Sequence, residues 1–512
     1  MIAYIIDNEW LYLDIQSPDV ESALIQFFSV KHPKAQYANN TEYWDGWYRK
    51  FDQRNQRLAL PYLTELKRFC EIKDVPLTIE DKRELPYYKP KLDLIKPDML
   101  NGITLMDYQL DAIKAACANN IGIIKAPTGS GKTEIAAGIA KVYGCPTLIV
   151  ADQRIVIEQL QERLELRSFT NEKVGLFYGG ATPNGQRIVV GSIQSINTPP
   201  MSLKRLKPEQ YAIRLKRARL FQAIASKCHL LIVDEADRAA SSNYKNLFKH
   251  YYSGRYKYGM SATPFDKDKP IENLLLKENL GSIVYDIPRS VVQSLGRIVP
   301  IKFYMIAFGE DGDKADATAF DIAEREIMVE NPIFHATVAK VVANYKDDRT
   351  LILVDTTNVE ELGHALEAIV PNSKFIFGKS SKRERDKCIE AFENGELKCL
   401  IGGKILKRGL DLQGGVDNLI LCGGGKLWSN FDQSIGRAVR KNTKGWARVF
   451  SFFFLNNKYL YSHSRSQLKA LVNMEYDSKV IFKNGIIDGT EFVKSKFRRK
   501  KHDKSSKTKT KA

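Results

Sequence analysis

The 512-residue sequence has few cysteines, and they are not clustered. Its seven cysteines are scattered, without a CxxC pair or a Cys/His group at zinc-ligand spacing. This pattern excludes a zinc module and a disulfide-stapled scaffold. Scattered thiols are typical of reduced, mostly buried cysteines, so we expect a cytoplasmic protein.

The sequence also lacks a long apolar run. No stretch approaches the roughly 18 apolar residues that a membrane-spanning helix needs, so we expect no membrane partner. The first residues, MIAYIIDNEWLYLDI, contain acids and no basic leader, so we expect no signal peptide. No internal repeat is visible. The length exceeds one ordinary hydrophobic core, which predicts roughly two to four domains.

Acidic residues are outnumbered by basic ones. The chain has 78 Lys and Arg against 60 Asp and Glu, a formal net charge of +18. This balance favours a polyanionic partner. From Lys494 onward, ten Lys and Arg stand against one Asp, so this tail carries +9, half of the excess. A basic tail is commonly only a solvated chain end, so the rest of the chain is only moderately basic.

Several short runs are apolar throughout and end in polar or glycine-rich turns. They read IGIIKA, PTLIVAD, RIVVGS, HLLIVDEAD, TLILVD, CLIGG and NLILCGG. Such runs are typical of strands buried on both faces of a parallel sheet. Amphipathic helical patterns lie between them, namely EIAAGIAKVY, IVIEQLQERL and NVEELGHALEAIV. The alternation predicts a doubly wound α/β architecture, in which ligands gather at the carboxyl ends of the strands.

The runs fall into two clusters, which predict two α/β domains. We place them at residues 91–290 and 291–470, after a small α+β domain at 1–90 and before a basic extension at 471–512. The stretch PYYKPKLDLIKPDM, with three prolines, is interpreted as the connector behind the first domain.

The stretch GIIKAPTGSGKTEI predicts a loop that holds a phosphate chain. Its glycines allow backbone amides to turn inward, and the following helix points its positive end at the same place. Lys132 can reach the β- and γ-phosphates, and the Thr133 hydroxyl can bind Mg²⁺. The pattern GxxxxGK[ST] is met except that Ala126 replaces the first glycine. The residues that we expect to hold the nucleotide are Ala126, Pro127, Thr128, Gly129, Ser130, Gly131, Lys132 and Thr133.

About a hundred residues later, HLLIVDEADRA carries two acids to the end of a predicted strand. Asp234 is placed to hold Mg²⁺, and Glu235 to orient and polarise an attacking water. With the phosphate loop, this pair predicts an NTPase. In YGMSATPF, Ser261 and Thr263 follow a short apolar run and could relay the nucleotide state to the second domain; a plain polar turn is the alternative.

The second α/β domain has no phosphate loop of its own. It has Gly409 and Asp411 in LKRGLDL, and Gln433, Arg437 and Arg440 in QSIGRAVRK. The two arginines are three residues apart and share one helix face. We expect them to contact the γ-phosphate as arginine fingers. A solvated basic helix face is the alternative.

Taken in order, APTGSGKT, DEAD, SAT, LKRGLDL and QSIGRAVR resemble motifs I, II, III, V and VI of superfamily 2 helicases. The resemblance covers about residues 100–460. It implies two RecA-like domains that close on ATP, with nucleic acid crossing both. It also implies that Gln109, in LMDYQLDAI, reads adenine, with a surface glutamine as the alternative. VADQRI and VGSIQSI resemble motifs Ia and Ic, which implies backbone contacts from Arg154 and Gln194.

The resemblance favours DNA over RNA. RNA helicases of the DEAD-box family usually show PTRELA and HRxGRxxR, where this chain has VADQRI and QSIGRAVR. The QxxGRxxR form is similar to that of DNA-acting members. The N-terminal YWDGWYRKFDQRNQRLALPYLTELKRFCE resembles the UvsW-like phage recombination helicases, whose small domain helps to bind duplex or branched DNA.

Aromatic and cationic side chains alternate in this N-terminal stretch, which suits phosphate contact and base stacking. The candidates are Trp47, Tyr48, Arg49, Lys50, Arg54 and Arg57. Trp44 or Trp47 could instead belong to the core of the small domain.

The sequence therefore predicts a monomeric ATP- and Mg²⁺-dependent DNA helicase that acts on branched DNA. It would meet recombination or replication proteins, in the host cytoplasm if a phage encodes it. A duplex-DNA translocase without strand separation and an RNA helicase are the alternatives. A nucleic-acid-binding module with a degenerate ATPase is disfavoured because the motif residues are intact.

Overall fold

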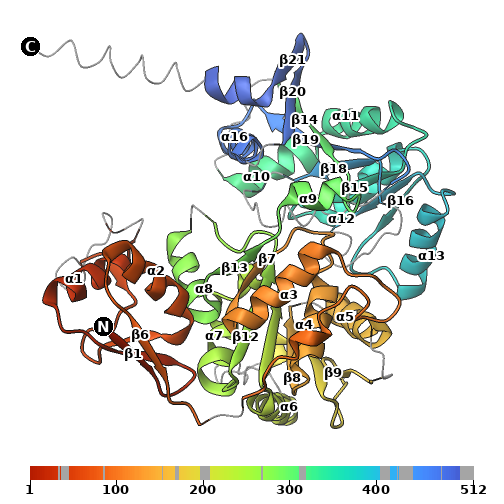
Figure 1. Ribbon diagram of the computed structural model, residues 1–512. Helices are drawn as coiled ribbons and strands as arrows, with labels where there is room; N and C mark the ends of the chain where they lie inside the picture. Colours follow the sequence, from red (N-terminus) through yellow and green to blue (C-terminus); the bar gives the residue numbers. More distant parts are fainter. Residues whose placement is uncertain are drawn as a thin grey trace, which may run out of the picture. The chain divides into compact units, whose positions relative to one another are not determined.

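The computed structural model divides into two compact units, Met1–Arg289 and Ser290–Ala512 (Figure 1). It describes residues 1–32, 35, 45–84, 87–152, 154–167, 172–195, 208–266, 269–310, 319–403, 415–423, 425, 442–473 and 476–495. The predicted architecture is confirmed: two α/β domains built on parallel sheets follow a small α+β domain.

The small domain is a four-stranded sheet covered by two helices. Its strand order is β5-β2-β1-β6, with β1 antiparallel to β2 and parallel to β6. Residues alternate between buried and less buried along β1 and β2, so one face of the sheet forms the core of this domain. A separate antiparallel ribbon pairs β3 with β4. The elements are β1 (Ile2–Ile5), β2 (Trp10–Asp14), α1 (Pro18–Phe27), β3 (Ser29–Lys31), β4 (Trp47–Arg49), β5 (Arg57–Ala59), η2 (Leu60–Tyr62), α2 (Leu63–Lys73) and β6 (Thr78–Asp81).

The first α/β domain is built on a parallel sheet that has seven strands among the described residues. Their order is β13-β7-β12-β11-β8-β10-β9, and each neighbouring pair is parallel. All the carboxyl ends therefore meet at one edge. The strands are β7 (Ile121–Lys125), β8 (Thr147–Ala151), β9 (Gly175–Phe177), β10 (Ile188–Ser192), β11 (Leu230–Asp234), β12 (Tyr256–Ser261) and β13 (Ile283–Asp286).

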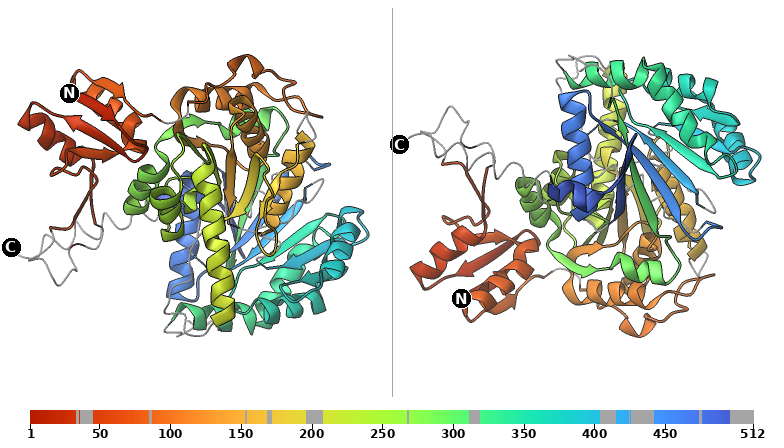
Figure 2. Two further views of the ribbon diagram at one scale, coloured as in Figure 1. Left: turned by 90° about the horizontal axis from the view of Figure 1, so that it is seen from below. Right: turned by 90° about the horizontal axis from the view of Figure 1, so that it is seen from above.

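Helices cover both faces of this sheet. Phe221 of α6, Leu247 of η6 and Leu280 of α8 pack in one cluster with Leu231 and Val233 of β11. Figure 2 shows α3 and α4 on the opposite side of the sheet from α6. The helices are η3 (Leu92–Leu94), α3 (Asp107–Asn119), α4 (Lys132–Tyr143), α5 (Arg154–Arg167), η4 (Ile193–Ser195), α6 (Pro208–Lys227), η5 (Ala236–Arg238), α7 (Ser242–Asn246), η6 (Leu247–Tyr251) and α8 (Pro270–Leu280).

The second unit holds another α/β sheet, with eight strands among the described residues. Its order is β16-β17-β15-β18-β19-β14-β20-β21, and only the terminal β20–β21 hairpin is antiparallel among these described pairs. The strands are β14 (Ile301–Phe308), β15 (Thr350–Val354), β16 (Ser373–Ile376), β17 (Cys399–Gly402), β18 (Asn418–Cys422), β19 (Ala447–Phe454), β20 (Asp477–Phe482) and β21 (Gly485–Asp488).

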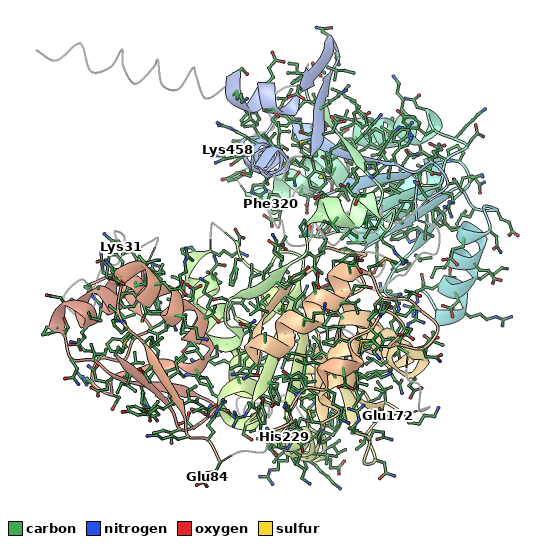
Figure 3. The ribbon with its side chains drawn as sticks, in the orientation of Figure 1. Lys31, Glu84, Glu172, His229, Phe320 and Lys458 are labelled. Carbon is green, nitrogen blue, oxygen red and sulfur yellow. The ribbon has the colours of Figure 1, made fainter. Side chains whose placement is uncertain are left out.

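Helices pack on this second sheet around an aromatic core. Phe334 lies against Phe452, with ring centroids 4.7 Å apart, and both are buried with Leu362. Phe320 and Lys458 mark the first residues of α10 and α16 in Figure 3. The helices are α10 (Phe320–Glu324), η7 (Arg325–Val329), α11 (Pro332–Ala343), α12 (Val359–Ile369), α13 (Lys382–Glu393) and α16 (Lys458–Asn473), while α9 (Arg289–Ser294) joins the two units in sequence.

The apolar runs and amphipathic patterns fold as the sequence predicts. Every run that was interpreted as a buried strand forms one, from β7 to β18, and the three helical patterns form α4, α5 and α12. In the described part of the chain, no helix combines the length and apolar character needed to cross a membrane.

Candidate functional site

The loop between β7 and α4 requires glycine at two positions. Gly129 and Gly131 have φ values of 87° and 82°, in the left-handed region that side chains rarely adopt. A Cβ atom on Gly131 would also stand 2.2 Å from Nε2 of Gln109. Gly131 caps α4, which begins at Lys132, so the amino end of this helix faces the loop. This geometry suits a phosphate group.

Helix α3 holds the loop from one side. The Tyr108 hydroxyl and the Gln109 Nε2 both donate to the carbonyl oxygen of Ser130, each at 3.0 Å. The Gln109 Oε1 accepts from the backbone N–H of Met106 at 2.9 Å. Gln109 is only 7% exposed, which excludes the surface-glutamine alternative. An amide retains a further donor and acceptor capacity, so its role toward adenine stays a prediction.

The acid pair lies at the same edge of the sheet as the loop. Asp234 ends β11, and only β12 separates β11 from β7. The Lys132 Nζ lies 3.7 Å from the Glu235 Oε1, so the loop and the acid pair face each other. Glu235 adopts φ 52° and ψ 55°, a conformation that costs a non-glycine residue free energy and is often found at functional sites.

Burial governs the electrostatics of these acids. It raises the pKa of Asp234 to about 6, and the neighbouring Glu235 adds to the shift while Lys132 opposes it. A buried carboxyl held next to a second carboxylate is stabilised by a cation. The donor set of carboxylate and hydroxyl oxygens, with Thr133 as the second residue of α4, suits Mg²⁺. We conclude that the residues present fit a magnesium–nucleotide complex.

A third acid, Asp237, belongs to the same site and was not singled out from the sequence. Its Oδ1 accepts a hydrogen bond from the Ser261 hydroxyl at 3.0 Å. Burial, and then the charge of Glu235, raises the pKa of Asp237 to about 7. The backbone N–H of Thr263 donates to the Ser261 oxygen at 3.3 Å. The last acid of the DEAD stretch was the available signal, because it stands three positions after Asp234 on a tight turn.

The structure does not test the predicted site residues of the second unit. Gly409, Asp411, Gln433, Arg437 and Arg440 all lie outside the described residues. Their contacts with nucleotide therefore stay predictions from the sequence.

The two weaker candidates for nucleic-acid contact follow neighbouring strands, β8 and β10. Arg154 begins α5, and its side chain lies outside the described residues. Gln194 donates from Nε2 to the backbone carbonyl of Asp152 at 2.9 Å and to its carboxylate. Asp152 also forms an ion pair with Arg238. Gln194 thus belongs to a polar network at the end of the strands.

Some of the N-terminal candidates for DNA contact are exposed, and others are paired with groups within the protein. Trp47 and Tyr48 on β4 are 37% and 40% exposed, so Trp47 is not a core residue. Arg49 is exposed beside Asp45, with which it forms an ion pair, and Arg54 is exposed. Lys31, which pairs with Trp47 in the β3–β4 ribbon, is labelled in Figure 3.

Two of the predicted DNA contacts have partners within the protein. The Lys50 Nζ lies 2.6 Å from the Glu278 Oε2 of α8, and the two side chains are only 15% and 17% exposed. Arg57 pairs with Asp52 at 3.0 Å and lies over the Trp10 ring. Contact of these two residues with DNA stays a prediction, and it would have to compete with these partners within the protein. Trp44 lies outside the described residues.

Two family models match the chain. The one described as "Type III restriction enzyme, res subunit" matches residues 102–266, and "Helicase conserved C-terminal domain" matches residues 335–442. The first contains the phosphate loop and the acid pair, and the second contains both predicted arginine fingers.

Curated relatives align over most of the chain. A protein named DNA 3'-5' translocase XPB2, from Sulfurisphaera tokodaii, is 25% identical over 76% of this chain and 88% of its own length. The ATP-dependent DNA helicase uvsW of Enterobacteria phage T4 is 20% identical over 93% of both. The DNA 3'-5' helicase XPB of Mycobacterium tuberculosis is 24% identical over 68% of this chain, which spans 60% of that relative.

One solved structure shares the fold, and another aligns over nearly the whole chain. A fragment of a putative HsdR subunit of a type I restriction enzyme from Vibrio vulnificus YJ016 matches with a TM-score of 0.50 and 17% identity, over 73% of this chain and 68% of its own. T4 UvsW matches over 94% of this chain and 98% of its own, with a TM-score of 0.43 and 16% identity.

Proposed function

Because the chain belongs to the superfamily 2 helicases and is an ATP-hydrolysing enzyme of that family, we propose that it unwinds or branch-migrates branched DNA. The motor activity rests on one observation: Lys132 and Glu235 face each other at the carboxyl ends of the strands of the first sheet. The exposed aromatic and basic side chains of the β3–β4 ribbon support a DNA substrate.

Each residue of the nucleotide site has a defined task. Backbone N–H groups of the Gly129–Gly131 turn and the amino end of α4 bind the phosphates, and Lys132 leaves Glu235 to neutralise their charge. Glu235 then orients a water molecule for in-line attack. Thr133 and Asp234 would hold Mg²⁺, which supplies Lewis-acid stabilisation of the phosphate charge. In this proposal Arg437 and Arg440 complete the site as arginine fingers, and Gln433, Gly409 and Asp411 also act at the nucleotide.

The N-terminal domain supplies the preference for duplex or branched DNA in this proposal. Its basic and aromatic ribbon suits phosphate contact and base stacking. The match to the phage helicase uvsW, over 93% of both chains, includes this domain and supports the substrate class. We also infer a monomer that works in the cytoplasm, in the host if a phage encodes it, together with recombination or replication proteins.

A duplex-DNA translocase that does not separate strands is the second candidate. It is favoured by the alignment with a relative named as a translocase, over 88% of that relative's length. An RNA helicase is the third candidate, because residues 234–237 read DEAD, the motif after which a family of RNA helicases is named.

One experiment separates these functions. ATP hydrolysis and strand separation are measured on single-stranded, duplex, forked and four-way DNA, with a matched RNA set. We expect the largest stimulation and unwinding on forked and four-way DNA. Stimulation without unwinding would identify the translocase, and preference for the RNA set would identify the RNA helicase. Lys132→Ala is the control, since losing the ammonium abolishes turnover. No stimulation by any nucleic acid contradicts all three functions.

A further inference from the structure

Four adjacent strands of the first sheet end in polar residues that contact one another. The strands β12, β11, β8 and β10 are neighbours in that order, and all are parallel. Their carboxyl ends therefore form a row. The nucleotide residues follow β7 and β11, whereas the loops that resemble nucleic-acid motifs follow β8 and β10. This row of strand ends therefore connects the nucleotide site to the loops that resemble nucleic-acid motifs.

Polar contacts cross this row without a gap. From β12 to β11, the Ser261 hydroxyl donates to Asp237 at 3.0 Å. From β11 to β8, the Arg238 guanidinium pairs with the Asp152 carboxylate. From β8 to β10, the Gln194 amide donates to the Asp152 backbone carbonyl at 2.9 Å and to its carboxylate. Each contact joins one strand end to the next.

Arg238 lies on the same tight turn as the acid pair. Its backbone N–H donates to the carbonyl oxygen of Glu235 at 3.2 Å, and Asp237 precedes it directly. The side chains of Arg238 and Asp152 are only 24% and 23% exposed. Partial burial makes such a pair stronger than one on the open surface. The turn and the ion pair therefore connect Glu235 to the loop after β8.

We propose that Arg238 is a positioning residue that couples the nucleotide state to the grip on nucleic acid, through Asp152 and Gln194. This inference rests on the proposed function, because it requires nucleic acid at the loops after β8 and β10. Arg238 does not touch the reacting atoms. Its task is to set the position of the loop that carries Asp152 according to the position of Glu235.

The test is a double-mutant cycle on the ion pair. Arg238→Ala, Asp152→Ala and the double variant are compared in two ratios: DNA-stimulated over DNA-free ATP turnover, and DNA affinity with a non-hydrolysable ATP analogue over that with ADP. Each single variant should reduce these ratios by about 5-fold or more, the lower range of a coupling between sites. The double variant should lose no more than either single one, and Arg238→Lys should recover part of the loss.

A matched ion pair in the same domain provides the control. Arg187 pairs with Glu172 at 2.6 Å, with side chains 30% and 24% exposed, but it precedes β10 and lies at the opposite end of the strands. Arg187→Ala should leave both ratios unchanged. Unchanged ratios in Arg238→Ala, or losses that add in the double variant, would overturn the coupling. If the wild-type protein shows no stimulation by DNA, the proposed function fails instead.

Discussion

Glu235 is the residue on which ATP turnover should depend most selectively. Glu235→Gln keeps the shape of the side chain and its acceptor oxygen, but it removes the carboxylate that orients water. We expect ATP to bind normally and turnover to fall by about 10²-fold or more, the usual contribution of a positioned base. Equilibrium binding of an ATP analogue and steady-state hydrolysis measure the two effects. Loss of binding would show that Glu235 is a structural residue or a direct metal contact.

The predicted fingers Arg437 and Arg440 give a second prediction at this scale. Arginine fingers contribute about 10³–10⁵ to rate, so Arg437→Ala and Arg440→Ala should each lower turnover at least roughly tenfold with little loss of ATP binding. Arg383→Ala, an exposed cation on α13 of the same unit, is the control. Wild-type turnover in both variants would contradict the finger role and favour the alternative, a basic helix face that contacts only solvent.

Asp237 makes stability depend on pH in the nucleotide-free protein. Its pKa is about 7 in the fold against an ordinary value of 3.8. The native state therefore binds this proton more tightly than the unfolded state, and Asp237 lowers stability as pH rises from about 4 to about 7. Asp237→Asn cannot ionise and keeps the oxygen that accepts from Ser261.

We therefore expect Asp237→Asn to become more stable, relative to the wild type, on going from about pH 5 to about pH 8. Denaturant unfolding at both values measures the difference. The exposed Asp111→Asn variant, on α3, should show no such change. A difference between Asp237→Asn and the wild type that is constant across this range would contradict the raised pKa.

At the scale of elements, the sequence predicts the strands well, but it does not predict how α8 packs against the N-terminal domain. β8 and β15 are apolar on both faces and an acid follows each of them directly, so their burial and the position of the acid at the sheet edge follow from local residues. The role of α8 does not, because it depends on partners more than two hundred residues away. Lys50 and Glu278 are indistinguishable from surface charges until the fold brings them together. The arrangement of Gln109 against Ser130 is hidden for the same reason.

Helix α8 joins the N-terminal domain to the motor domain. The Tyr62 hydroxyl donates to the Leu274 carbonyl oxygen at 2.6 Å, and Leu274 packs in the core of the small domain. Glu65 accepts from Lys277 at 2.6 Å and from Ser282 at 2.8 Å. The surrounding hydrogen bonds and the charge of Lys277 lower the pKa of Glu65 against the opposing effect of burial. Deleting residues 1–90 would expose this surface, so such a truncation is expected to destabilise the first sheet.

Glu65→Ala tests this docking without truncation. It removes both hydrogen bonds and leaves Lys277 beside an apolar surface. We expect a loss of about 1–3 kcal/mol in the free energy of unfolding, since hydrogen bonds to charged groups contribute in that range. Glu71→Ala on the exposed face of the same helix α2 is the matched control and should change stability by less than about 0.5 kcal/mol. Equal effects of the two substitutions would show that the contact with α8 is not stabilising.

At the scale of the whole molecule, DNA affinity has two basic sources that must be separated. One is the β3–β4 ribbon, fixed to α8 through Lys50. The other is the tail from Lys494 onward, with its net charge of +9. A tail attracts any polyanion, whereas a fixed ribbon meets DNA in one geometry. Removing the tail should therefore weaken all DNAs alike without changing their ranking.

Ribbon substitutions should instead change the ranking of DNAs in the full-length protein. Trp47→Ala and Tyr48→Ala should each lower affinity for forked and four-way DNA by about 1–3 kcal/mol if a base stacks on the ring, with the salt dependence unchanged. Arg49→Ala should flatten the slope of log affinity against log salt by about 0.9, the value for one lost phosphate contact. The ion pair of Arg49 with Asp45 is too exposed to prevent an exchange for phosphate. Lys67→Ala, an exposed cation on α2, is the control.

Binding measured across a range of salt concentrations distinguishes the outcomes. If Arg49→Ala and Lys67→Ala flatten the slope equally, the charge of the domain attracts DNA without a specific surface. If neither aromatic substitution changes the preference for branched over single-stranded DNA, the ribbon does not select the substrate. The likeness of this domain to that of the phage helicases would then be one of fold.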